Sequence, residues 1–206
     1  MRIEHDPLTV TAEQEENEIV STIDELEDPI KRIIDQLREE IDKGQISLII
    51  GEDASGRIPT LIVASVINNI YKSKGFKIPQ IKFIAGSRNI AGMTEWYMRD
   101  KKDKIRKLIE QIPNNGDRVL IVTDTIVSGS SVEPIASVLD TLGKEKIIAT
   151  IGTEDIKGAD EDRKRRIGAG RVVSGGLATP VIYQNKDLSG VRKEPWQLHA
   201  HFYEMV

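Results

Sequence analysis

The 206-residue sequence contains no cysteine, no secretory signal pattern and no long apolar run. The lack of cysteine excludes disulfide bonds, cysteine–zinc sites and thiol nucleophiles together. The opening letters, MRIEHDPLTV, lack the basic and then apolar order of a signal peptide. The longest apolar stretch, residues 58–71, is interrupted by a proline and two asparagines, so it is too short and too polar to cross a bilayer. We therefore expect a cytoplasmic protein with no membrane partner.

The negative charge of the chain is concentrated at its beginning. The formal net charge is −4, yet residues 1–30 hold ten acidic residues and a single basic one, Arg2. The rest of the chain is therefore mildly basic, which suits ligands that carry phosphate groups. This excess of positive charge is too small to indicate nucleic acid by itself, so that partner is not expected but stays open.

Buried strands alternate with helices along the middle of the chain. Short apolar runs predict the strands, because a strand covered on both faces is apolar throughout. Such alternation predicts an α/β fold in which helices flank a parallel central sheet. The expected strands are residues 46–50, 81–85, 119–122 and 146–151, with shorter ones at 171–173 and 181–183, and the expected helices are residues 29–42, 59–73, 99–112 and 132–143.

Three expected loops, residues 51–57, 86–98 and 123–131, follow strands and should meet at one edge of the sheet, where parallel sheets bind ligands. In the third loop, backbone N–H groups at a helix start converge on an anion, and several serine hydroxyls add donors. Gly129 lets the backbone close around a phosphate. Asp124, at the end of the strand, can bind a sugar diol or hold a metal-bound water. The pattern predicts a site for a ribose 5-phosphate.

The segment VLIVTDTIVSGSS, residues 119–131, resembles the motif with which type I phosphoribosyltransferases bind phosphoribosyl pyrophosphate (PRPP). That motif has four apolar residues, two acids and a loop similar to Thr/Ser-Gly-Gly-Thr/Ser. Asp124 matches the second acid, whereas Thr123 stands in the position of the first acid and Ser130 in that of the second glycine. The segment GEDASGR, residues 51–57, is similar to the pyrophosphate loop of the adenine-type enzymes. The order of elements agrees with the family over residues 29–151.

The resemblance implies transfer of a phosphoribosyl group between pyrophosphate and a nitrogenous base, with Mg²⁺ as cofactor and PRPP or a nucleoside monophosphate as ligand. It assigns catalytic roles to Asp124 and Arg57 and Mg²⁺ binding to Asp53 and Asp124. It also assigns a PRPP-binding α/β core to residues 29–151 and a remaining core strand with a base-selecting hood to residues 152–206, and the concentration of acids sets residues 1–28 apart as an acidic N-terminal arm. The substrate-binding residues that it implies are Glu52, Asp53, Ala54, Ser55, Gly56, Arg88, Thr123, Thr125, Val127, Ser128, Gly129, Ser130 and Ser131.

Other interpretations of the same residues stay open. Residues 117–143 also suit a strand, turn and helix without a ligand, and residues 51–57 suit a tight turn. Residues 86–98 suit either a lid over the reactive centre or a surface loop that packs on the body. Thr123 and two basic runs, within residues 99–107 and at residues 163–166, favour a second function. In that case the protein senses PRPP or a nucleotide without turnover and regulates a nucleic acid or a protein. The amphipathic helix expected at 29–42 leaves room for a homodimer.

Overall fold

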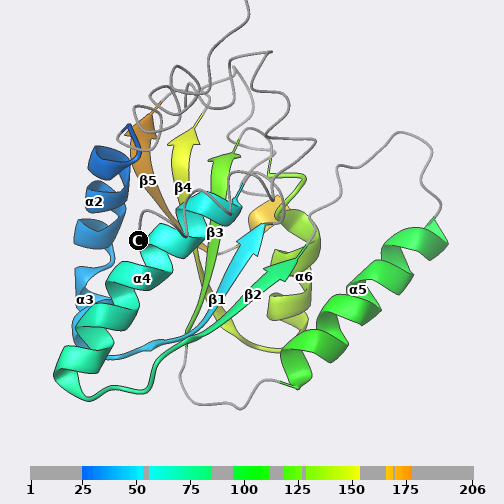
Figure 1. Ribbon diagram of the computed structural model, residues 1–206. Coiled ribbons are helices and arrows are strands. Elements are labelled where there is room, and N and C mark those ends of the chain that lie inside the picture. The colour runs from blue at the N-terminus through cyan, green and yellow to red at the C-terminus, as the bar shows by residue number, and fades with distance from the viewer. Residues whose placement is uncertain are drawn as a thin grey trace, which may run out of the picture.

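Five parallel strands form the single sheet of the described chain (Figure 1). The computed structural model describes residues 25–52, 56–84, 95–111, 118–126, 129–153, 166–168 and 170–177. The strands lie in the order β2-β1-β3-β4-β5, so β3 is the central strand. The α/β fold with a parallel central sheet is therefore confirmed. The strands are β1 Ile46–Glu52, β2 Gln80–Ile84, β3 Arg118–Ile126, β4 Glu145–Thr153 and β5 Arg171–Leu177.

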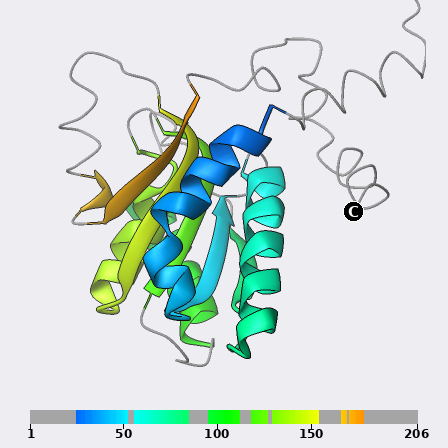
Figure 2. The same ribbon diagram turned by 90° about the vertical axis from the view of Figure 1, so that its left-hand side faces the viewer.

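Helices cover both faces of this sheet. One face packs against α2 and α4, which lie side by side in Figure 2, and against α3; the other face packs against α5 and α6. Within the described residues, no helix is long and apolar enough to pass through a membrane. The helices are α2 Glu27–Gln36, α3 Arg38–Asp42, α4 Arg57–Lys74, α5 Glu95–Glu110 and α6 Glu133–Thr141.

Alternating side chains of the central strand separate the two cores. Leu120 and Val122 point into the core under α2 and α4, whereas Val119 and Ile121 point into the core under α5 and α6. This alternation follows from the period of two in a strand, and all four side chains are at most 4% exposed. The apolar letters of β3 thus face helices on both sides, as a fully buried strand requires.

Several elements differ in length from the sequence-based expectation. The strand expected at 119–122 continues to Ile126, because Thr123, Thr125 and Ile126 pair with β4. The last four residues of the loop expected over 86–98 are helical, because α5 begins at Glu95, and residues 86–94 lie outside the described residues. Aromatic residues lower helix propensity only slightly, so the Trp-Tyr pair does not keep this segment out of the helix. The helix expected at 29–42 is divided at Leu37 into α2 and α3.

Candidate functional site

The ends of β1 and β3 bring Glu52, Thr123 and Asp124 together at the carboxyl edge of the sheet, the edge at which the parallel strands end. Gly51 is paired with Val122 in the parallel ladder of β1 and β3. The next residues along the two strands, Glu52 and Thr123, are therefore neighbours. Glu52 is 7% exposed, Thr123 is 0% exposed and Asp124 is 8% exposed. Two carboxylates are thus buried side by side, which is costly unless hydrogen bonds or a cation compensate them.

Hydroxyl groups bind these carboxylates. The Thr123 hydroxyl donates to Glu52 Oε2 at 2.5 Å, and its oxygen lies 3.2 Å from Asp124 Oδ1. The Ser131 hydroxyl also donates to Glu52 Oε2, at 3.2 Å. A hydroxyl carries one proton, so Thr123 donates to the nearer Glu52 while it contacts Asp124. We call these three residues, the carboxylates of Glu52 and Asp124 and the Thr123 hydroxyl that contacts both, the carboxylate triad.

A buried threonine of β4, Thr150, lies next to the carboxylate triad. The Thr150 hydroxyl donates to the carbonyl oxygen of Gly152 at 2.6 Å, and its oxygen lies 3.1 Å from the backbone carbonyl oxygen of Asp124. Sequence reasoning missed Thr150, although a buried polar residue near the end of an apolar strand was a usable signal.

The expected phosphate loop enters α6 through a sharp turn at Gly129. Its φ of +74° lies in the left-handed region that glycine adopts without strain. The Gly129 carbonyl accepts the N–H groups of Val132 and Glu133 at 3.2 and 2.9 Å. Ser131 uses its single hydroxyl proton on Glu52, so a phosphate bound here would receive its hydrogen bonds mainly from backbone N–H groups.

The remaining expected site residues have varied positions. Thr125 has a buried hydroxyl that makes no hydrogen bond within the described residues. Arg57 is the first residue of α4, and its guanidinium carbon lies 5.0 Å from the centre of the Phe83 ring. The described residues contain no group of three or more histidine or acidic side chains that could hold a metal ion. The expected site residues that lie outside the described residues are Asp53, Ala54, Ser55, Arg88, Val127 and Ser128.

Gly56 lies where a side chain does not fit. A Cβ at this position would be 2.7 Å from the carbonyl oxygen of Glu52 and 3.0 Å from that of Val122. The Gly56 carbonyl accepts both the N–H and the hydroxyl of Thr60, at 3.0 and 2.6 Å, which fixes the first turn of α4. The start of α4 therefore lies directly on the ends of β1 and β3, next to the carboxylate triad.

Replacement of Gly56 by alanine should lower the free energy of unfolding by about 1–3 kcal/mol, because two strand ends must move away from the added methyl group. Urea unfolding followed by circular dichroism measures this change. The matched control is Ser65→Ala, at an exposed position of the same helix, which should have almost no effect. Equal unfolding midpoints for the two variants would show that the close packing at Gly56 is unimportant.

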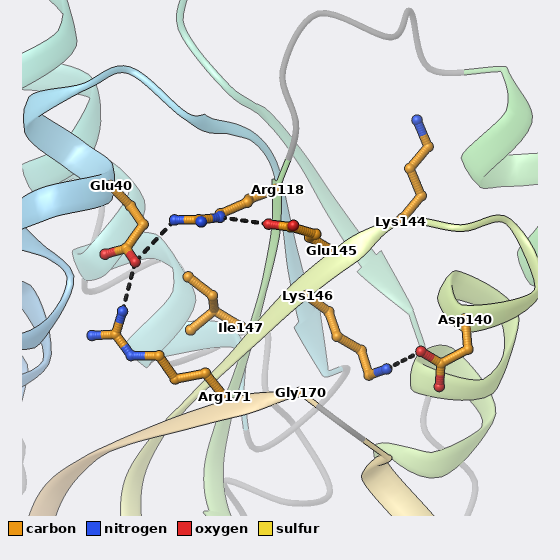
Figure 3. A pocket seen from close by; sticks show the side chains of 9 residues that line it. All are labelled: Glu40, Arg118, Asp140, Lys144, Glu145, Lys146, Ile147, Gly170 and Arg171. Atoms are coloured by element: carbon orange, nitrogen blue, oxygen red, sulfur yellow. Dashed lines mark hydrogen bonds and ion pairs between the residues drawn. The ribbon is translucent and has the colours of Figure 1, made fainter.

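A pocket of about 390 Å³ lies at the opposite edge of the sheet, where β3, β4 and β5 begin (Figure 3). Glu40 Oε1 accepts from Arg118 at 3.0 Å and from Arg171 at 2.6 Å. Arg118 also donates to Glu145 at 2.8 Å, and this bond raises the pKa of its guanidinium. Lys146 pairs with Asp140. Because these acids and bases pair with one another, we interpret this edge as a structural tie between α3 and the sheet.

Comparison of the chain with models of protein families, with curated proteins and with solved structures finds no match.

Proposed function

We propose that the protein binds a phosphoribosyl ligand, PRPP or a nucleoside monophosphate, at the carboxyl edge between β1 and β3. We further propose that it transfers the phosphoribosyl group between pyrophosphate and a nitrogenous base. One observation carries the proposal: the buried carboxylate triad lies within hydrogen-bond distance of the loop that leads into α6. Carboxylates that bind sugar hydroxyls and a helix start that binds phosphate are the two halves of a ribose 5-phosphate site.

The chemistry follows from charge development at the sugar. As the bond from C1 to the leaving group lengthens, positive charge grows on the ribose ring, and a fixed carboxylate such as Asp124 stabilises it. The loop at Gly129–Ser131 would hold the 5-phosphate and so fix the ring relative to Asp124. No covalent nucleophile is needed, because positioning and electrostatic stabilisation carry the reaction. In the reverse direction, pyrophosphate attacks the same carbon of a nucleotide.

The resemblance implies Mg²⁺, and the donor chemistry at this edge suits it. Magnesium prefers oxygen ligands and keeps several waters, so one or two carboxylates together with substrate phosphates are enough to hold it. Asp124 offers a carboxylate that is 8% exposed near the carboxyl end of β3, and Asp53, next in sequence to Glu52, is the second expected ligand. When bound, the ion would neutralise charge on the departing pyrophosphate. Arg57 would contribute positive charge from the start of α4.

Calorimetric titration of the full chain with PRPP, in the presence and absence of Mg²⁺, tests the binding step. We expect saturable binding that Mg²⁺ strengthens, because the ion screens the repulsion between pyrophosphate and the buried acids. Ribose without phosphate serves as the control ligand and should bind far more weakly. Absence of heat with PRPP under both conditions would contradict the proposal.

A specific observation keeps the sensor as a second candidate. Thr123 occupies the place of an acid, and its hydroxyl proton is used on Glu52. Release of pyrophosphate from PRPP across a panel of purine, pyrimidine and other nitrogenous acceptors separates the two functions. Turnover with any acceptor supports the transferase, whereas binding of PRPP without turnover across the panel favours the sensor. If the sensor acts on a nucleic acid, the affinity of the protein for that nucleic acid should depend on salt and should change when PRPP is added.

A further inference from the structure

The carboxylate of Glu52 lies beside the position that an acid at residue 123 would occupy. The Oγ1 atom of Thr123 is one bond from Cβ, which is the place that Cγ of an aspartate would take. Glu52 Oε2 is 2.5 Å from this atom, and the oxygens of an aspartate would lie about 1.2 Å beyond it. Adjacent strands are about 4.8 Å apart, a separation that the extra methylene of glutamate helps to cross.

We propose that Glu52 supplies, from β1, the carboxylate that the phosphoribosyltransferase motif places on β3, and that it contacts the ribose hydroxyls together with Asp124. This inference rests on the proposed function and names a binding residue of the same site. The functional unit is then Glu52 with Thr123 rather than an acid at 123 alone. In this arrangement, the site keeps its carboxylate although residue 123 is a threonine, because Thr123 positions the carboxylate of Glu52 from β1.

The hydrogen bonds at Glu52 suit a role in binding. An ionised carboxylate has about four lone-pair sites, and two hydroxyl donors, from Thr123 and Ser131, bind Oε2. These donors fix the orientation of the carboxylate at the carboxyl edge of the sheet. Because Thr123 is 0% exposed, its hydroxyl must be satisfied inside the protein, which ties it to Glu52.

A purely structural role for Glu52 is the competing explanation. In that case, Glu52 would only hold the loop before α6 in place through Ser131. Its removal would then weaken the binding of every phosphate ligand alike, because the loop as a whole would shift. Direct contact with the ribose predicts a loss that depends on the sugar hydroxyls. The two roles therefore differ in how the loss varies with the ligand.

The test combines Glu52→Gln with ligands that lack the ribose diol. Calorimetry compares ribose 5-phosphate with 2,3-dideoxyribose 5-phosphate on both proteins. We expect the wild type to prefer the diol by about 100-fold and Glu52→Gln by about 10-fold, because a site built for hydroxyls rejects ligands that lack them. Affinity for the dideoxy ligand should be similar in the two proteins. An equal preference for the diol in both proteins would overturn the inference.

A second pair of variants moves the carboxylate between the strands. Glu52→Thr should lose most of the preference for the diol, and Glu52→Thr combined with Thr123→Asp should recover it, because the acid then comes from β3. Failure of the double variant to recover the preference, with thermal unfolding like that of the single variant, would count against the inference. If the wild type binds neither PRPP nor ribose 5-phosphate, the proposed function itself is wrong. Binding by the wild type with no dependence on Glu52 contradicts only the inference.

Discussion

Asp124→Asn is expected to weaken PRPP binding by about 100-fold, because hydrogen bonds to a charged group contribute about 1.5–3 kcal/mol. Asp124 is 8% exposed near the carboxyl end of the central strand, and its backbone carbonyl oxygen lies 3.1 Å from the Thr150 hydroxyl. The amide has the shape of the carboxylate, so the fold should be preserved while the negative charge is lost. Calorimetric titration with PRPP and Mg²⁺ measures the change in affinity.

The control for this variant is Asp42→Asn. Asp42 ends α3, pairs with Lys74 at 2.8 Å and is half exposed. A carboxylate in this position is outside the proposed site, so PRPP affinity should equal that of the wild type. If Asp124→Asn also bound PRPP like the wild type, the ribose could not lie against Asp124 and the assignment of the site would be wrong.

Glu40→Ala is expected to lower the free energy of unfolding by about 3 kcal/mol, because it leaves two arginines facing each other without their shared carboxylate. The Glu40 side chain is 4% exposed, whereas Arg118 and Arg171 are 29% and 48% exposed. Water can partly solvate the two arginines, so the loss should lie at the lower end of the range for a buried pair. Urea unfolding at constant ionic strength measures it.

The neighbouring residue provides a matched control for this prediction. Glu39 is 72% exposed and pairs with Lys43 one helical turn away. Surface pairs of this kind contribute little, so Glu39→Ala should unfold at nearly the same urea concentration as the wild type. Equal midpoints for Glu39→Ala and Glu40→Ala would show that the three-residue cluster does not stabilise the fold.

The layers of the fold could be predicted from the sequence because each strand is a local pattern. The apolar run at residues 119–122 is sufficient to identify the centre of β3. Its continuation through Thr123, Asp124 and Thr125 could not be predicted in the same way, because polar letters after an apolar run resemble a loop. Pairing with β4, opposite Thr150 and Gly152, keeps these residues in the strand. The end of a strand cannot be predicted from a short stretch of sequence when it depends on pairing with residues 26 or more positions away.

The sequence indicated which residues belong to the candidate site, but it did not indicate which of them contact one another. Glu52 and Thr123 were both expected to bind substrate, yet their hydrogen bond depends on the register between β1 and β3 across 71 residues. The same limit applies to Glu40 at the other edge, whose arginine partners lie 78 and 131 residues away. Charged residues with distant partners leave no periodic signal, so sequence patterns could not reveal either group.

A crystal structure of the chain with PRPP and Mg²⁺ would show whether the ligand binds at the carboxyl edge between β1 and β3. We expect the 5-phosphate at the loop Gly129–Ser131 and the ribose hydroxyls within hydrogen-bond distance of Asp124 and Glu52. Electron density for the ligand in the pocket at the amino ends of β3 and β4, or no density at the carboxyl edge at saturating PRPP, would contradict it.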